Sequence, residues 1–327
     1  RQACSPFGSR HGRPDEHMQK QQSQLPDFLI IGAQKSATTW LAHLLRQHPR
    51  VYMPEKELHF FNHPGTLSQY VAAFRNARPG QLIGEKTPDY LHLTKRQIAR
   101  IKQWMPSVRL IVVLRDPVAR SWSQARMEVA AVNRRPLARR DRFWLAWHVH
   151  LLRNRLRSDY RRALRRWLQF FPRQQFLILF YEDLHQNPLS FIRKVFDFLG
   201  LSPLPEQTLQ AFAERRVWES PGAEMPCWLR YVLTCRCRSQ TRWLAQQGYE
   251  VPASWPTDAL AHQLRRSARG LPFKAWILTG MFTLMALPEH LLVYLGRGFP
   301  ALRLYRLYDR LQYWRIRKKK HAGPSTG

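Results

Sequence analysis

Apolar and polar residues alternate in regular blocks between residues 26 and 200. Three apolar runs have the composition of buried parallel strands, and each is followed by polar residues: FLIIG at 28–32, VRLIVVLRDP at 108–117 and QFLILFYEDL at 175–184. Segments with helical spacing come after these runs: 38–48, 121–130 and 187–200, the last closed by Gly200. The pattern predicts an α/β fold, a three-layer, doubly wound parallel sheet with helices on both faces.

In a sheet of this kind, ligands bind beyond the carboxyl ends of the strands. Four polar segments follow apolar runs and are therefore expected to converge at one end of the sheet: Gly32–Thr39, Glu85–Asp89, Arg115–Ser123 and Tyr181–Asp183. A further amphipathic helix is expected at residues 94–105. The expected binding site lies where these segments meet.

The two ends of the chain differ from this central part. Residues 1–25 are polar and predict a disordered lead-in, and residues 26–257 form the main domain. Residues 258–327 are expected to be an α-helical extension that is both apolar and basic.

The extension has two features that suggest a membrane surface. Its apolar run, 275–287, is interrupted at Pro288 and is shorter than the roughly 20 apolar residues of a membrane span. Residues 301–320 place arginines on one helical stripe and leucines near another. Residues 275–320 are therefore expected to contact an anionic membrane surface. The alternatives are helices packed on the core, or a basic tail without a special role.

The charge balance points to anionic partners. The chain has 53 Lys and Arg against 22 Asp and Glu, a net charge of +31. Residues 134–166 alone hold twelve arginines and two acids, interleaved with aromatic residues. This segment is either a solvated amphipathic helix pair or a basic wall beside an acidic substrate. A nucleic-acid partner is not expected.

The four cysteines, Cys4, Cys227, Cys235 and Cys237, include no C-x-x-C pair, and no histidine cluster accompanies them. This spacing predicts free thiols and no metal site, and the alternative, a disulfide from Cys227 to Cys235 or Cys237, would need an oxidising compartment.

The segment GAQKSATTW, which begins at Gly32, has the order of a phosphate-binding loop between a strand and a helix. Backbone N–H groups, the Lys35 amine and the hydroxyls of Ser36, Thr38 and Thr39 are all suitable partners for an anion. The nucleoside-triphosphate loop reads G-x-x-x-x-G-K-[ST], and its second glycine is absent here. The segment therefore predicts a phosphate site of another type.

Two further motifs carry candidate chemistry. Arg115 follows the strongest apolar run, and Ser123 lies in the helix expected after it, so the two side chains are expected to hold a second phosphate. Asp116 is expected to cap that helix. In KELHFF, Glu57 or His59 is a candidate general base, although a histidine packed on two phenylalanines is the plainer interpretation of His59.

Taken together, these motifs resemble the sulfotransferases that use 3′-phosphoadenosine 5′-phosphosulfate, and most of all the heparan-sulfate and related carbohydrate sulfotransferases and their bacterial counterparts. The resemblance covers about residues 26 to 200 and rests on FLIIGAQKSATTWL, KELHFF, GEKTPDYL, LIVVLRDPVARSWSQ and FLILFYEDL, in that order. It implies a phosphate-loop-like nucleotide site and transfer of a sulfuryl group, with the donor nucleotide as co-substrate and no metal.

The resemblance also assigns roles to residues. Glu57 is the implied general base, and Lys35 and Lys86, with His59 beside them, complete the catalytic set. The implied nucleotide-binding residues are Gly32, Lys35, Ser36, Ala37, Thr38, Thr39, Arg115 and Ser123. The family's nucleotide-covering loop corresponds to ERRVWESPGAEMP (214–226), where Arg215 and Arg216 are candidates although the match is poor.

The acceptor is expected to be a carbohydrate, a glycolipid or a small alcohol, with an amine as the alternative to a hydroxyl. Two other functions compete: a nucleoside-triphosphate-dependent kinase or hydrolase, which needs the full loop, and a non-catalytic basic binding protein. The chain as given is expected in the cytoplasm or at a membrane, and in the Golgi lumen if an anchor precedes Arg1.

Overall fold

The computed structural model describes residues 24–133, 136–214, 224–267 and 271–298. Its strands are β1 (Phe28–Gly32), β2 (Val51–Tyr52), β3 (Leu82–Lys86), β4 (Arg109–Leu114) and β5 (Phe176–Phe180). All pairings are parallel, in the order β2-β3-β1-β4-β5. The predicted α/β fold with a doubly wound parallel sheet is therefore confirmed.

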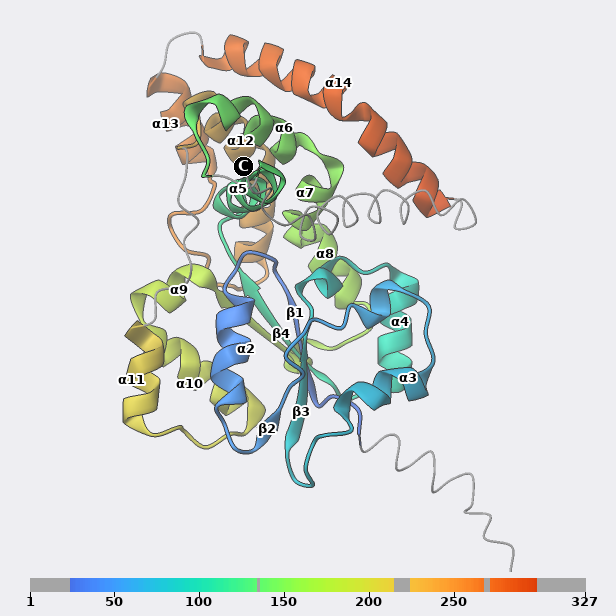
Figure 1. Cartoon of the computed structure of the whole chain (residues 1–327). Coiled ribbons are helices and arrows are strands. Elements are labelled where there is room, and N and C mark those ends of the chain that lie inside the picture. The colour runs from blue at the N-terminus through green and yellow to red at the C-terminus, as the bar shows by residue number, and fades with distance from the viewer. Residues whose placement is uncertain (1–23, 134–135, 215–223, 268–270, 299–327) are drawn as a thin grey trace, which may run out of the picture.

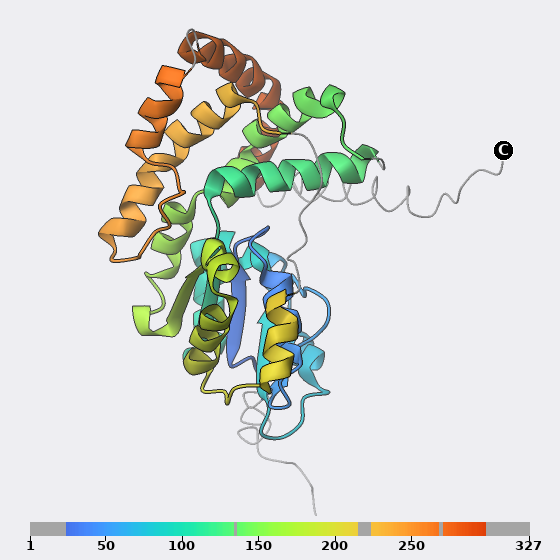
Figure 2. The same cartoon turned by 90° about the vertical axis from the view of Figure 1, so that its left-hand side faces the viewer.

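The α-helices fall into two groups, which Figure 1 and Figure 2 show at opposite ends of the molecule. Those beside the sheet are α2 (Thr38–Arg46), α3 (Leu67–Val71), α4 (Lys95–Trp104), α8 (Tyr160–Trp167), α9 (Tyr181–Gln186), α10 (Pro188–Leu199) and α11 (Glu206–Glu214). Those of the helical half are α5 (Pro117–Asn133), α6 (Arg142–His150), α7 (Leu152–Arg157), α12 (Cys227–Gln246), α13 (Asp258–Ser267) and α14 (Leu271–Gly298). Short 3₁₀ turns lie at Phe60–Asn62, Ala72–Phe74, Pro88–His92, Arg139–Asp141 and Arg173–Gln175.

Alternation along the central strands creates two cores, one on each face of the sheet. In β1, Leu29 and Ile31 face the core beneath α3, α4 and α8, whereas Phe28 and Ile30 face the core beneath α2, α10 and α11. All five residues of β1 are buried, which explains its nearly continuous apolar sequence.

A third core holds the helical half together. Val118 and Trp122 of α5 pack there with side chains of α6 and α12, and Phe282 brings in α14. The Phe282 ring lies 5.2 Å from Phe143 of α6 and 5.9 Å from Trp228 of α12, so α14 is anchored to two other helices. The predicted C-terminal helical region is thus confirmed over residues 258–267 and 271–298, and α14 packs on helices from the middle of the chain.

Several expectations need correction in detail. Two strands, β2 and β3, were not predicted, because one has two residues and the other, LIGEK, ends in charges. The helix expected at 38–48 ends at Arg46.

Pro288 interrupts the apolar run but not the helix, since α14 continues to Gly298. Within the described residues, no helix is long and apolar enough to cross a membrane. The helix expected at 301–320 lies outside the described residues.

Candidate active site

The loop between β1 and α2 has an unusual backbone. Lys35 (φ 69°) and Ala37 (φ 60°) both adopt the left-handed conformation, which turns successive N–H groups in the manner of anion-binding loops. Gly32 is required for a different reason, because a Cβ there would lie only 2.8 Å from Leu91 Cβ. The sequence GAQKSAT therefore folds as a tight loop that leads directly into the N-terminus of α2.

Ser36 is the most informative side chain of this loop. It is completely buried, and its Oγ has no hydrogen-bond partner in the described part of the chain. Buried hydroxyls are nearly always paired, so an unpaired one at a helix N-terminus marks a position where an anionic oxygen would be accepted. Thr38 is buried beside it, at 4% exposure, and Thr39 is exposed.

Arg115 joins this loop to the carboxyl end of β4. Its Nη1 donates to the Lys35 carbonyl over 2.9 Å, and its guanidinium lies 4.3 Å from the centre of the Tyr181 ring. Ser123, buried on α5, comes from the same β4–α5 unit. Asp116 accepts from Val118 N over 2.8 Å, so the expected helix cap is present. Tyr181, the first residue after β5, is thus brought to Arg115 as the convergence of strand ends requires.

Cations are concentrated around the loop. Burial, followed by repulsion from Arg115, Arg126 and Arg120, lowers the pKa of the Lys35 ammonium. The Lys35 Nζ lies 3.5 Å from the sulfur of Met127 on α5, so it reaches from the loop toward the helical half. A group with several positive neighbours and a lowered pKa is suited to hold an anion with more than one charge.

A second cluster forms around Glu57. Lys86 Nζ donates to Glu57 Oε1 over 2.6 Å, and His59 Nε2 lies 3.1 Å from Glu57 Oε2. Burial raises the pKa of Glu57, but the hydrogen bonds from His59 and Lys86 outweigh it and lower the pKa overall. The hydrogen bond to Glu57 is in turn the main cause that raises the pKa of His59. His59 is therefore not simply a histidine packed on the neighbouring phenylalanines.

Lys86 connects the two clusters. Besides Glu57, its Nζ donates to Thr39 Oγ1 over 3.2 Å, and Thr39 belongs to the first turn of α2. The side chain is 7% exposed. One ammonium group at the end of β3 thus lies between the candidate base and the candidate phosphate loop.

Two contacts near the Glu57 cluster were missed by sequence reasoning. Asp89 Oδ2 lies 4.0 Å from His59 Nδ1 on the side away from Glu57, and Asp89 also pairs with Arg157 Nη2 over 2.7 Å. Arg157 comes from the arginine-rich segment 134–166, and its guanidinium also lies 3.8 Å from Glu128. The only available signal was the position of Asp89 after GEKTP, because its partner is 68 residues away.

Glu85 precedes Lys86 on β3 but has a structural task. Its carboxylate accepts from Tyr90 OH over 2.6 Å, from Thr87 Oγ1 over 2.9 Å, and from Tyr70 OH. Burial raises its pKa despite these hydrogen bonds. Because Glu85 is almost fully enclosed, at 1% exposure, it fixes the loop after β3 from beneath and does not face a ligand.

The structure therefore brings the predicted residues into two groups that meet at Lys86. The phosphate-loop group comprises Gly32, Lys35, Ser36, Ala37, Thr38, Thr39 and Arg115, with Ser123 on the adjoining helix. The other group comprises Glu57, His59 and Lys86. Their roles toward a nucleotide stay predictions. Arg215 and Arg216 lie outside the described residues. No group of histidine, cysteine or acidic side chains in the described ranges is arranged to hold a metal. Cys227, Cys235 and Cys237 are free thiols on α12.

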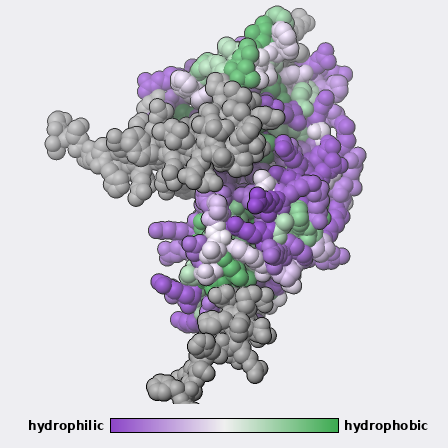
Figure 3. Space-filling view, turned by 90° about the vertical axis from the view of Figure 1, so that its right-hand side faces the viewer, coloured by the Kyte–Doolittle hydropathy of each residue, from purple (hydrophilic) through white to green (hydrophobic). Residues whose placement is uncertain are grey.

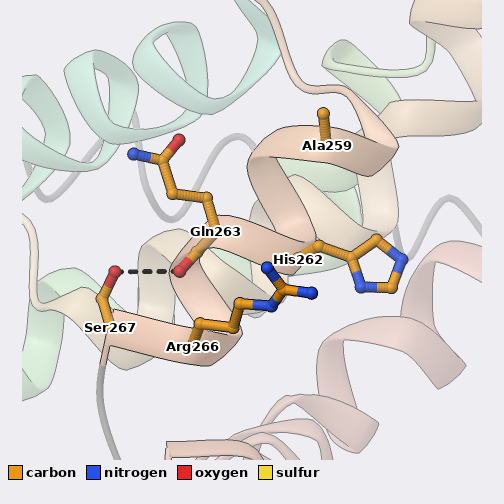
Figure 4. A pocket seen from close by; sticks show the side chains of 5 residues that line it. All are labelled: Ala259, His262, Gln263, Arg266 and Ser267. Atoms are coloured by element: carbon orange, nitrogen blue, oxygen red, sulfur yellow. Dashed lines mark hydrogen bonds between the residues drawn. The ribbon is translucent and has the colours of Figure 1, made fainter.

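One surface hollow lies elsewhere and has no part in this site. It is lined by Ala259, His262, Gln263, Arg266 and Ser267, all from α13 (Figure 4). Ser267 Oγ donates to the Gln263 carbonyl over 2.8 Å, one turn earlier in the same helix. A hollow formed by one helix face has no converging groups of the kind found around Lys86, so we assign it no chemistry.

Comparisons with known proteins agree with this geometry. The sulfotransferase domain family matches residues 25–221. Heparan sulfate glucosamine 3-O-sulfotransferase 3B1 of Mus musculus is 35% identical over 192 residues, which cover 54% of this chain and 47% of that protein. Heparan sulfate glucosamine 3-O-sulfotransferase 6 of Homo sapiens is 33% identical over 190 residues, or 54% and 53% of the two chains. The chain thus spans about half the length of the curated relatives it matches.

A solved structure extends the match. The crystal structure of a sulfotransferase from Alicyclobacillus acidocaldarius is similar with a TM-score of 0.55 and 25% identity. The similarity covers 69% of this chain and 97% of that one, so nearly the whole of the bacterial protein has a counterpart here.

Proposed function

This chain belongs to the sulfotransferase domain family, and on that premise we propose that it transfers a sulfuryl group from 3′-phosphoadenosine 5′-phosphosulfate to an acceptor hydroxyl. The observation that carries the proposal is the position of Lys86, whose Nζ contacts both Thr39 at the phosphate loop and Glu57. A sulfuryl donor needs cations at its bridging oxygen, and an acceptor hydroxyl needs a base. Lys86 lies next to both.

The residues present fit the donor nucleotide. The unpaired, buried Ser36 hydroxyl and the N-terminus of α2 would hold its 5′-phosphate, together with Thr38 and Thr39. Arg115, directly after the neighbouring strand β4, and Ser123, on the helix α5 that follows, would hold the 3′-phosphate. Lys35, between Arg115 and α5, would contact the bridge to the sulfate.

When bound, the nucleotide supplies the sulfuryl group and leaves as 3′,5′-bisphosphate. Glu57 takes the proton of the acceptor hydroxyl, so the acceptor oxygen is free to form its new bond to sulfur as the bond to the bridging oxygen breaks. Lys86 and Lys35 stabilise the negative charge that develops on the bridging oxygen. His59, whose pKa is raised by its hydrogen bond to Glu57 and by nearby Asp89, orients the carboxylate while Lys86 binds its other oxygen.

The acceptor is proposed to be a carbohydrate or a glycolipid. The relatives are named for heparan sulfate glucosamine, and this chain carries a net charge of +31. Arg157 of segment 134–166 pairs with Asp89, which lies beside His59 near the proposed base. The kinase or hydrolase alternative is set aside, because the family match includes the whole phosphate loop. The non-catalytic alternative predicts nucleotide binding or surface binding without turnover.

Transfer of labelled sulfate from the donor to a panel of glycans, glycolipids and small alcohols tests the proposal. We expect labelling of at least one carbohydrate, and a loss of about 10²–10⁴-fold in turnover for Glu57→Gln, the usual contribution of a general base. Affinity for immobilised 3′,5′-bisphosphate should be kept in this variant. Full turnover in Glu57→Gln would refute the base assignment, and absence of both labelling and nucleotide binding would refute the enzyme.

A further inference from the structure

Helix α14 is apolar on both of its long sides. The inner side carries Ala275, Phe282 and Ala286, which are almost completely buried against α6 and α12. The outer side carries large hydrophobic residues that are exposed, at the spacing of one helical face: Phe273, Trp276, Ile277, Met281, Leu284, Met285 and Leu287. A helix at the surface of a soluble domain normally has polar residues on its outer side, so the composition of this face calls for a partner.

Helix α6, which packs against α14 through Phe143 and Phe282, also exposes aromatic side chains. Trp276, Phe273 and Leu284 are 75%, 69% and 67% exposed. Phe143, whose ring lies 5.2 Å from that of Phe282 and meets Trp144 edge-on at 5.4 Å, is itself exposed together with Trp144. We call the seven outer residues of α14, with Phe143 and Trp144, the apolar face. Figure 3 shows hydrophobic surface along the upper edge of the molecule, where α14 lies in Figure 1.

Exposed cations border the apolar face, whereas the nearby Asp141 is buried. Arg139 and Arg140, both exposed, lie in the turn before Phe143 and Trp144. At the other end, Lys274 of α14 and Arg265 and Arg266 of α13 are exposed, and Figure 4 shows the Arg266 and His262 side chains projecting from the same helix. The sequence has no acidic residue between Asp258 and Glu289. The charge of this region is thus complementary to an anionic surface.

We propose that the apolar face docks on an anionic phospholipid surface, with α14 lying along the interface. Tryptophan, leucine and phenylalanine on one side with arginine and lysine at its margins are the residues that such interfacial helices use. The phospholipid head groups contact the bordering cations, while the exposed aromatic and aliphatic side chains enter the boundary of the acyl chains. This places the membrane contact on residues 139–144 and 273–287. Residues 275–287 lie in the region expected from the sequence, whereas 273–274 and the turn leading into α6 were missed by sequence reasoning.

The docking surface is a property beyond the proposed reaction, and it would place that reaction at a membrane surface. The apolar face belongs to the helical half, whose α5 also carries Ser123 and Met127, next to the Lys35 amine. An enzyme held by this half at a membrane would act on acceptors presented at that surface.

Co-sedimentation of the full chain with sucrose-loaded vesicles tests the docking, using phosphatidylcholine alone and phosphatidylcholine with added phosphatidylglycerol. We expect strong binding to the anionic vesicles, weak binding to the neutral ones, and a decrease with salt. Trp276→Ser combined with Leu284→Ser should lower binding to anionic vesicles by about tenfold or more for each side chain. Arg139→Gln combined with Arg140→Gln should lower it about fivefold for each charge, on anionic vesicles alone.

The matched control is Lys95→Gln with Arg96→Gln, which removes two exposed cations from α4 beside the sheet. Binding should be unchanged in this variant, and an equal decrease would mean general charge attraction and refute the docking surface. The docking surface would also be refuted if the variant with Trp276→Ser and Leu284→Ser bound anionic vesicles as strongly as the wild-type chain. Failure of the wild-type chain to sediment with vesicles, as expected if residues 299–327 covered the face, would refute it as well. A dimer that this variant dissociates, without vesicle binding, would identify a second copy as the occupant.

Affinity for 3′,5′-bisphosphate, measured in parallel, shows that each variant is folded. It also separates the two proposals, because loss of vesicle binding with intact nucleotide binding concerns the docking alone.

Discussion

Replacing Lys86 by methionine tests whether one cation serves both halves of the candidate site. The Lys86–Glu57 contact is 2.6 Å long, with Lys86 7% and Glu57 32% exposed. Hydrogen bonds between charged groups contribute about 1.5–3 kcal/mol, and the partial exposure of Glu57 favours the lower part of that range. We therefore expect kcat/KM to fall about tenfold to fiftyfold, since about 1.4 kcal/mol corresponds to a factor of ten.

The pH dependence distinguishes the reasons for that loss. In the wild-type chain, the lowered pKa of Glu57 keeps the base ionised well below neutral pH, so activity should decline only below about the ordinary value of 4.5. Without Lys86, Glu57 keeps burial and loses one of the two hydrogen bonds that oppose it. Its pKa should rise, and the acid limb of kcat/KM should move to higher pH.

The control is Lys56→Met, which removes an exposed cation from the residue before Glu57 and should change neither quantity. The assay is sulfate transfer to an acceptor found in the panel, followed across pH with nucleotide affinity measured alongside. A loss of turnover with an unmoved acid limb would refute the link between Lys86 and the base. Wild-type activity in Lys86→Met would refute the role of Lys86 altogether.

Three further predictions concern groups around the site. Ser36→Ala should lower the affinity for 3′,5′-bisphosphate about tenfold while leaving the melting temperature of the free chain unchanged or higher, because a buried unpaired hydroxyl is removed; equal losses in both would contradict it. Asp89→Asn removes a carboxylate 4.0 Å from His59 Nδ1, so the pKa of His59, followed by NMR, should fall toward 6.5. For Asp116, burial raises the pKa from 3.8 to about 6, so its contribution to stability is complete below pH 3.8 and is lost as pH rises through about 6. Asp116→Asn should therefore flatten the decrease in urea-unfolding free energy between these pH values, about 3 kcal/mol at most, and an unchanged slope would count against this assignment.

The framework of the fold could be predicted from the sequence because β1 and β4 are buried on both faces and the edge strand β5 is apolar throughout. Such strands read as continuous apolar runs, and the phosphate loop follows the first of them without a gap. β3 was not predicted as a strand, because its last two residues are charged. They are accommodated in a buried strand only because side chains from other parts of the chain bind them. Glu85 needs Tyr70 and Tyr90, and Lys86 needs Glu57 and Thr39.

The same limit applies to the arginine-rich segment 134–166. Its charge suggested either a solvated helix pair or a wall facing a substrate. The structure shows a third situation for Arg157, which is 13% exposed and pairs with Asp89 beside the candidate base. Pairing across 68 residues depends on how α7 packs beside the loop after β3, and no local pattern in the sequence contains that information.

The group of cations around the phosphate loop links binding to stability. Burial, followed by repulsion from Arg115, Arg126 and Arg120, lowers the pKa of Lys35, and the Arg120 side chain bonds to neutral partners such as Ser158 and Asn154. In the free chain this arrangement is destabilising, and nothing in the loop itself neutralises it. A ligand with several negative charges would relieve the repulsion and raise the pKa of Lys35, so nucleotide binding at alkaline pH should be accompanied by proton uptake. A bound anionic substrate, as the proposed function requires, would therefore match the charge of the loop.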